Sequence, residues 1–347
     1  MKVALRIFIW NALFFSVAGL QAQDPVFSQF FASPLQTNPA FTGVTFAPRI
    51  TLNYRNQYTN WLGGSAYKTY AASYEQSIES LNSGLGLTLM ADDAGQGIYK
   101  TNQVSAFYSY RVRTNNDIFF QFGMEAGFTQ STLDWDQLIF GDQLDPLNGP
   151  TDPSGNPYLS EENRPESLNQ TRFDVSAGLL VYTGSVYGGI SLKHLNTPDE
   201  SLIGLNESIN AGRPMRITLH GGGDFPIGRR NKRGEPSFIS PNLLFIKQGD
   251  FGQINGGAYA GLGRVFTGLW YRHTFSNPDA VILLAGFREG VLRIGYSYDL
   301  TISRLATAPG GAGGTHEISL TIDFSDSKVL KSRRKSARIT DCFKMFK

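Results

Sequence analysis

Apolar and polar side chains alternate at every second residue through a long series of segments between about residue 47 and residue 324. One segment carries its apolar residues on a single face of an extended chain: Val175, Ala177, Leu179 and Val181. The next segment follows after only Gly184 and Ser185, the length of a tight hairpin turn. Because successive side chains of a β-strand point to opposite faces, whereas a helix repeats every three to four residues, the pattern predicts an all-β protein.

We expect about fourteen strands, an even number as in the single-chain barrels of bacterial outer membranes. They span residues 47–57, 67–77, 83–92, 98–112, 117–130, 172–183, 185–194, 214–224, 238–248, 251–262, 264–274, 278–288, 290–300 and 315–324. The predicted fold is a transmembrane antiparallel β-barrel with an apolar outer face and a polar lumen. A soluble periplasmic protein is the alternative, because no later stretch approaches the roughly 18 apolar residues that a membrane helix needs.

The lengths of the connections predict how the barrel is oriented. If the N-terminus is in the periplasm, short connections such as Gly184-Ser185 and Glu289-Gly290 are periplasmic turns. The two longest connections, about residues 131–171 and 195–213, then face outward. We therefore expect both the N-terminus and the C-terminus in the periplasm.

The chain divides into four expected parts. Residues 1–22 have the features of a signal peptide, with Lys2 and Arg6 ahead of a short apolar run and Ala22 at the cleavage site; an uncleaved anchor helix is the alternative. Residues 23–46 form an N-terminal segment in the periplasm or the lumen, and residues 47–324 form the barrel. Residues 325–347 form a short basic tail in the periplasm, either solvated or docked on a partner.

The composition argues against several classes of function. The net charge is only +2, so no strong positive field indicates nucleic acid as a partner. Cys342 is the only cysteine, which excludes an intramolecular disulfide and a zinc site built from cysteines. The sequence contains no His-Glu-x-x-His, Gly-x-Ser-x-Gly or Gly-x-x-x-x-Gly-Lys motif. We expect no catalytic residues, no metal and no cofactor; a lipase-type barrel enzyme is the alternative.

Three groups of residues carry a resemblance to a known family. They are Phe27-Ser28-Gln29-Phe30 with Asn38-Pro39-Ala40 and Gly43, then Asn53-Tyr54-Arg55-Asn56-Gln57, and finally Gly295-Tyr296-Ser297-Tyr298-Asp299-Leu300 with His316-Glu317-Ile318-Ser319-Leu320. In their order and spacing, the sequence resembles the PorP/SprF family of type IX secretion system outer-membrane proteins of the Bacteroidetes. The tail departs from that family, whose members often have a proline after a C-terminal cysteine, whereas Phe343 follows Cys342 here.

The resemblance implies an integral outer-membrane barrel that supports the secretion or surface retention of other proteins, including adhesins used in gliding motility. Its partners would be other type IX secretion complex proteins, a secreted adhesin or the adhesin's C-terminal domain, and outer-membrane lipid. A passive outer-membrane porin or solute channel is the alternative function.

Two sets of residues are the candidate functional positions. The first is expected to form a lumen plug or a partner-binding surface, because its aromatic side chains would be costly to expose to water: Phe27, Ser28, Gln29, Phe30, Asn38, Pro39, Phe41 and Gly43. The second set is expected to line the lumen or belong to the family motifs: Asn53, Arg55, Gln57, Asp299, His316 and Glu317. We expect Arg55 to pair with a lumen carboxylate such as Glu75 or Glu125. Aromatic side chains at the bilayer edges are expected at Tyr54, Tyr67, Trp270 and Tyr296.

Overall fold

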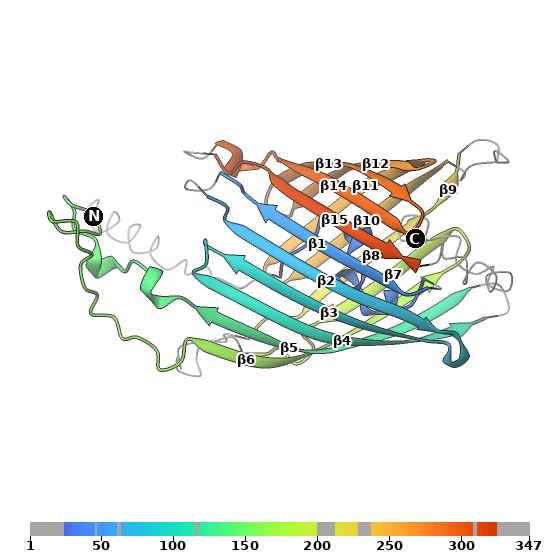
Figure 1. Cartoon of the computed structure of the whole chain (residues 1–347), viewed down its shortest axis with the longest axis horizontal. Coiled ribbons are helices and arrows are strands. Elements are labelled where there is room, and N and C mark those ends of the chain that lie inside the picture. The colour runs from blue at the N-terminus through green and yellow to red at the C-terminus, as the bar shows by residue number, and fades with distance from the viewer. Residues whose placement is uncertain are drawn as a thin grey trace, which may run out of the picture.

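Antiparallel strands form the entire wall of a barrel (Figure 1). They are β1 (Arg49–Gln57), β2 (Tyr67–Ile78), β3 (Ser83–Ala94), β4 (Tyr99–Arg113), β5 (Phe119–Leu133), β6 (Asn169–Tyr182), β7 (Val186–Lys193), β8 (Arg216–Gly223), β9 (Phe225–Pro226), β10 (Phe238–Gln248), β11 (Phe251–Leu262), β12 (Val265–Thr274), β13 (Pro278–Glu289), β14 (Leu292–Thr301) and β15 (Thr315–Asp323). β9 continues β8, since both pair with β10, so the wall has 14 strands. β15 pairs with β1 and closes the ring.

The computed structural model describes residues 24–45, 47–60, 64–114, 118–199, 212–227, 237–307 and 311–324. The expected signal peptide and basic tail therefore lie outside the described residues. Within the described ranges, no helix is both long enough and apolar enough to cross a membrane.

The strands lie where the alternation predicted them, with every boundary within three residues of its expected position. The prediction of an antiparallel transmembrane barrel is confirmed. The alternation was informative because one face of each strand meets the lumen and the other meets hydrocarbon. A shift of one residue would exchange the two faces, so the sequence specifies the register strongly.

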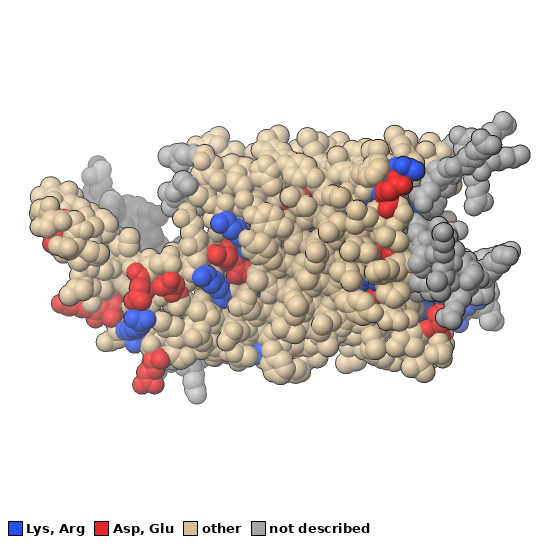
Figure 2. All heavy atoms as spheres, viewed as in Figure 1, with Lys and Arg blue, Asp and Glu red and all other residues tan. Residues whose placement is uncertain are grey.

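The outer face of the wall is apolar. On β3, Leu85, Leu87 and Leu89 point away from the lumen and are 47%, 45% and 49% exposed. A water-soluble protein rarely exposes so much contiguous apolar surface, whereas a bilayer solvates it. Figure 2 shows the charged side chains of one face gathered mainly near the two ends of the barrel, with a nearly uncharged band between them.

We name the two mouths of the barrel by their connections. The long-loop end carries residues 134–168, which join β5 to β6 and extend far beyond the wall in Figure 1. The short-turn end is where β15 ends at Asp323 and β1 begins at Arg49.

Candidate functional site

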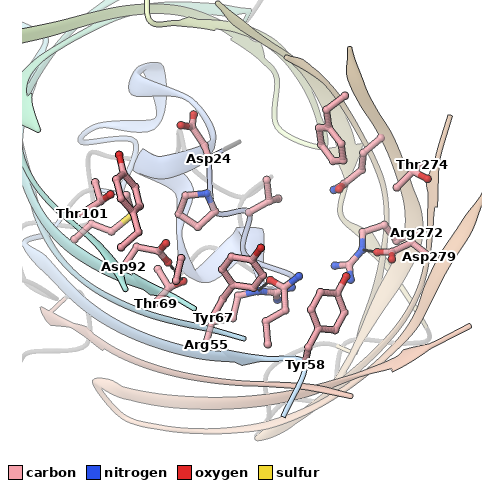
Figure 3. A pocket seen from close by; sticks show the side chains of 18 of the residues that line it. Asp24, Arg55, Tyr58, Tyr67, Thr69, Asp92, Thr101, Arg272, Thr274 and Asp279 are labelled. Carbon is pink, nitrogen blue, oxygen red and sulfur yellow. Dashed lines mark hydrogen bonds and ion pairs between the residues drawn. The ribbon is translucent and has the colours of Figure 1, made fainter. Parts of the chain in front are cut away.

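Residues 24–45, hereafter the lumen segment, run inside the barrel from the long-loop end to the short-turn end. Asp24 contacts His194 and Arg213 at the long-loop end. The backbone amide of Gly43 reaches Glu75 near the short-turn end. Figure 3 shows the segment as a pale blue ribbon enclosed by strands. None of its described residues is exposed, so the segment is part of the barrel's interior.

The two described ends of the chain therefore lie at opposite ends of the barrel. Asp24 is at the long-loop end, whereas Asp323 pairs with Arg49 at the short-turn end. The termini themselves lie outside the described residues, so the expectation that both are in the periplasm stays a prediction. The direction of β1 did not indicate that Asp24 lies at the long-loop end, because the segment before β1 is long enough to cross the lumen.

Three short helical turns shape the lumen segment: η1 (Phe30–Ala32), α2 (Pro34–Thr37) and η2 (Pro39–Phe41). Pro34 and Pro39 occupy the first positions of α2 and η2, where the missing N–H is not needed. The Asn38 side chain caps η2 by accepting a hydrogen bond from the Ala40 amide (2.8 Å). These turns leave many backbone groups free to bond to the wall.

The first anchor of the lumen segment is a buried charged network around Ser28. Glu317 on β15 accepts hydrogen bonds from the backbone amides of Ser28 (2.8 Å) and Gln29 (2.9 Å). The Ser28 hydroxyl donates to Asp299 on β14 (2.6 Å). Arg55 on β1 lies 3.0 Å from Glu317 and 3.4 Å from Asp299. The three groups of residues that carry the family resemblance thus meet at one place.

Gln29 is completely buried in the same anchor. Its side-chain nitrogen donates to the Ser297 hydroxyl (3.2 Å) and to the Glu317 carbonyl (2.9 Å), and its oxygen accepts from the Ser319 hydroxyl (2.6 Å). A Cβ atom at Gly295 would lie 2.6 Å from this oxygen. Glycine at that position therefore makes room for the Gln29 amide.

The second anchor is the side chain of Asn38, which is also completely buried. Its nitrogen donates to the carbonyl oxygens of Leu179 and Ile190, both at 3.1 Å, and lies 2.9 Å from the imidazole of His220. A Cβ atom at Gly178 would lie only 1.9 Å from the Asn38 side-chain oxygen. The wall is therefore shaped to receive this amide.

The third anchor lies near the short-turn end. Glu75 accepts a hydrogen bond from the Gly43 amide (2.8 Å) and forms a buried ion pair with Arg49. The carbonyl oxygen of Thr42 accepts from the Gln121 side chain (2.7 Å). Gly43 has a φ of 66°, in the left-handed region that favours glycine, and this turns the chain toward β1.

Glycines of the wall bring the backbone of the lumen segment into direct contact with the strands. A Cβ atom at Gly123 on β5 would lie 2.3 Å from the backbone nitrogen of Ala40. One at Gly84 on β3 would lie 2.3 Å from the carbonyl oxygen of Thr42. Glycine inside a strand often marks such a close approach. The barrel wall is therefore complementary in shape to this particular segment.

Aromatic contacts hold the segment between its polar anchors. Three ring pairs join the segment to the wall, each with centroids 5.0 Å apart: Phe30 with Trp270, Phe31 with Tyr259, and Phe41 with His220. Burying a Phe side chain stabilises a fold by about 1.5–3 kcal/mol. The apolar contacts therefore add substantially to the polar anchors.

The structure buries all eight residues of the first candidate set against the wall. They are Phe27, Ser28, Gln29, Phe30, Asn38, Pro39, Phe41 and Gly43. A role of these residues in binding partners stays a prediction.

The second candidate set divides between the two faces of the wall. Five members face the lumen: Asn53, Arg55, Gln57, Asp299 and Glu317. His316 does not, because it is the neighbour of Glu317 on one strand and so points outward. There its Nδ1 atom lies 2.7 Å from the Tyr296 hydroxyl.

Arg55 pairs with lumen carboxylates as expected, but they are Asp299 and Glu317, and the two named candidates, Glu75 and Glu125, are wrong. Glu75 pairs with Arg49, and Glu125 lies 3.1 Å from Lys193. The alternation predicts whether a side chain points into the lumen or outward. It does not predict which inward-pointing residues of different strands lie at the same level along the barrel axis.

Two of the four expected bilayer-edge aromatic residues are elsewhere. Trp270 is buried in the lumen against Phe30, and Tyr67 lines the cavity described below. Tyr54 packs against the exposed Tyr70 on the outer face. These aromatic residues were expected on the outer face. The lumen segment provides an apolar contact inside the barrel for Trp270, which packs against Phe30.

A charged cluster that no sequence motif indicated holds the start of the lumen segment. The Asp24 carboxylate lies 2.7 Å from His194, 3.0 Å from Arg213 and 2.9 Å from Arg216. The other ring nitrogen of His194 lies 2.8 Å from Asp174. These residues are far apart in the sequence and match no motif, so only the folded barrel brings them together.

The charges of this cluster shift the pKa values of its members. Burial by itself would raise the pKa of the Asp24 carboxyl, but His194, Arg216 and Arg213 outweigh burial and hold that pKa well below its usual range. Burial would lower the pKa of His194, but Asp24 and Asp174 outweigh it and raise that pKa above its usual range. The cluster therefore favours a charged histidine between carboxylates.

We predict that this anchor is strongest in mildly acidic solution. The contribution of His194 is complete below the ordinary histidine pKa of about 6.5 and is lost as pH rises through the higher folded-state pKa. The contribution of Asp24 is complete above the ordinary aspartate pKa of about 3.9 and is lost at lower pH. A spin label near Asp24 should be least mobile between about pH 4 and pH 6.5. In the His194→Gln variant the alkaline loss should disappear; an unchanged alkaline profile in that variant would contradict the assignment.

A cavity of about 520 Å³ lies over the start of the lumen segment at the long-loop end (Figure 3). Three arginines and three carboxylates line it, with tyrosine and threonine side chains between them: Arg55, Arg213, Arg272, Asp24, Asp92 and Asp279. In the part of the chain that the structure describes, no group of three or more His, Cys, Asp or Glu residues could hold a metal ion.

An antiparallel barrel with an apolar outer face and a polar interior is an outer-membrane β-barrel protein. The family model of the type IX secretion system membrane protein PorP/SprF matches residues 19–322, and the chain belongs to this family. The protein is therefore a non-enzymatic membrane component of type IX secretion, as its resemblance implied.

No curated protein matches the sequence. Among solved structures, the barrel is similar to Omp33 of Acinetobacter baumannii (6% identity, TM-score 0.42, covering 82% of this chain and 100% of that chain). It is also similar to BamA of Haemophilus ducreyi lacking POTRA domains 1–3 (9%, 0.38, 80% and 71%). A mutant Rhodopseudomonas blastica porin also matches (7%, 0.32, 81% and 99%).

Proposed function

We propose that this protein serves type IX secretion as a closed barrel that supports the export or surface retention of a secreted adhesin. The observation that supports this role is the lumen segment, which runs through the interior from one end of the barrel to the other and is held by three buried anchors. A passive porin needs a water-filled path through its lumen. The residues that form these anchors, Ser28, Gln29, Asn38 and Gly43, belong to the segment that resembles the family motif, which supports closure of the lumen as part of the function.

We further propose that the long-loop end faces the cell surface and the short-turn end faces the periplasm. Outer-membrane barrels carry short periplasmic turns and longer outer loops, which supports this orientation. The cavity and residues 134–168 would then be available to an adhesin or its C-terminal domain. The short-turn end would be available to other proteins of the secretion complex.

Co-purification from the native membrane tests the proposed function. The tagged chain would be isolated in a gentle detergent, with its partners identified by mass spectrometry and an unrelated barrel with the same tag as the control. We expect enrichment of secretion-complex proteins or of one large secreted adhesin. A barrel that purifies alone and conducts ions steadily in planar bilayers would overturn the proposal in favour of a passive channel.

A further inference from the structure

Among the described residues that line the cavity at the long-loop end, one carboxylate forms no ion pair. Asp24 is paired with Arg213 and Asp279 with Arg272. Asp92 on β3 accepts a hydrogen bond from the Thr69 hydroxyl (2.5 Å), and it forms no ion pair with any described residue. One of its oxygens is therefore available to a ligand.

The strand register surrounds this carboxylate with short hydroxyl side chains. Thr69 on β2 and Thr101 on β4 are the direct neighbours of Asp92 in the sheet. Figure 3 shows Thr101, Asp92 and Thr69 along one wall of the cavity, with Tyr67 beside them. These small side chains leave the space in front of the carboxylate open.

Two tyrosines flank the pocket at the next inward position toward the mouth. There Ala94 is paired with Tyr67 on one side and with Tyr99 on the other. Adjacent strands are about 4.8 Å apart, so the two tyrosine backbones stand about 10 Å apart with only a methyl group between them. Both tyrosines line the cavity. Aromatic faces beside a carboxylate are the usual surroundings of an organic cation.

The adjacent Asp93 differs from Asp92 in the residues beside it. Asp93 points to the outer face, where Lys68 and Lys100 are its direct neighbours in register. Asp92 has threonines at the equivalent inward positions. The chain therefore supplies cations beside the outer carboxylate and leaves the inner one open to a cation from elsewhere.

Arg55 and Arg213 act on Asp92 electrostatically across the cavity, but neither forms an ion pair with it. Arg55 also faces the cavity but is paired with Asp299 and Glu317, and Arg213 is paired with Asp24. Gln253 lines the same cavity, is 5% exposed, and has a side-chain nitrogen without a hydrogen-bond partner among the described residues. An unsatisfied buried donor favours a ligand that also carries an acceptor, such as a peptide carbonyl.

We propose that the pocket formed by Tyr67, Thr69, Asp92, Tyr99 and Thr101 binds the guanidinium or ammonium group of a basic residue in a peptide. The carboxylate attracts the charge, the tyrosine rings contact its sides, and the Gln253 amide is free to donate to the peptide backbone. This binding activity goes beyond the proposed role in secretion and does not depend on it.

Calorimetric titration of the purified full-length barrel in detergent tests this site. The probes are acetyl-Gly-Arg-Gly-amide, the neutral acetyl-Gly-Gln-Gly-amide, and spermidine as a free amine. We expect the arginine peptide to bind at least about tenfold more tightly than the glutamine peptide. Asp92→Asn should weaken binding of the arginine peptide by about tenfold or more, whereas the matched outer variant Asp93→Asn should leave it unchanged.

The outcomes distinguish two questions: whether the pocket binds an organic cation, and whether that cation belongs to a peptide or to a free amine. Tighter binding of spermidine than of the arginine peptide, lost in Asp92→Asn, would support the pocket and identify a free amine as its ligand. Equal binding of the arginine and glutamine peptides, or undiminished binding by Asp92→Asn, would overturn the proposal. If Asp92→Asn fails to fold, Tyr99→Leu gives a second test, with a loss of affinity for the arginine peptide expected.

Discussion

The Gly123→Ala substitution is expected to displace the middle of the lumen segment and open the barrel to ions. The added methyl group would lie 2.3 Å from backbone atoms of Pro39 and Ala40, and backbone cannot rotate away as a flexible side chain can. Asn38 is fixed on one side of this contact by its own hydrogen bonds. Overpacking of this kind costs about 1–3 kcal/mol and is relieved by release of the segment.

Single-channel recording in planar bilayers measures this effect. The unaltered barrel should conduct little, and Gly123→Ala should show large, frequent openings. Gly184→Ala is the matched control, because Gly184 lies in the turn between β6 and β7 and a Cβ atom there would meet nothing within 4 Å. If both variants conduct as little as the unaltered barrel, the close contact of Gly123 with the backbone of Pro39 and Ala40 does not hold the segment in place.

The Glu317→Ala substitution is expected to release the start of the lumen segment. Glu317 is completely buried, accepts the amides of Ser28 and Gln29, and pairs with Arg55. Its loss would leave two buried N–H groups without acceptors and deprive the arginine of a counter-charge. Removing one partner of a buried ion pair typically costs about 3–5 kcal/mol. Limited proteolysis should cut the segment much faster, and the urea midpoint of the folded barrel should fall.

Glu289→Ala is the matched control for this prediction. Glu289 lies 2.6 Å from Arg264, but the two side chains are 53% and 71% exposed. Exposed pairs of this kind contribute about 0–1 kcal/mol, so neither proteolysis nor the midpoint should change much. Equal sensitivity of the two variants would show that the network around Ser28 does not hold the segment.

The strands could be predicted closely because each one lies between two different solvents. A residue such as Leu87 faces hydrocarbon and its neighbour Thr88 faces the interior, so a repeat of two is imposed at every position. The connections were predictable from the same pattern. The closing pair, β1 with β15, followed only from the assumption that a membrane sheet cannot leave an edge unpaired.

The candidate site could be predicted in part. Aromatic residues before the first strand indicated a packed segment, and the alternation indicated that Arg55 faces the lumen. The same alternation, applied to Glu317 and His316, shows that only one of the two can face inward. Inward glycines such as Gly123 and Gly178 could have been noticed as a sign of close backbone approach. Nothing in their sequence positions indicated what approaches them.

The sequence by itself determined the strands, their faces and the closed antiparallel wall, because these depend on local alternation between two solvents. The tertiary structure alone decided the path of the lumen segment, the position of Asp24 opposite Asp323, and the partners of Arg55. It also decided that Asp92, which forms no ion pair with a described residue, lies between two threonines and next to two tyrosines. These features depend on which residues of distant strands lie at the same level along the barrel axis. The alternation of apolar and polar residues contains no information about that level.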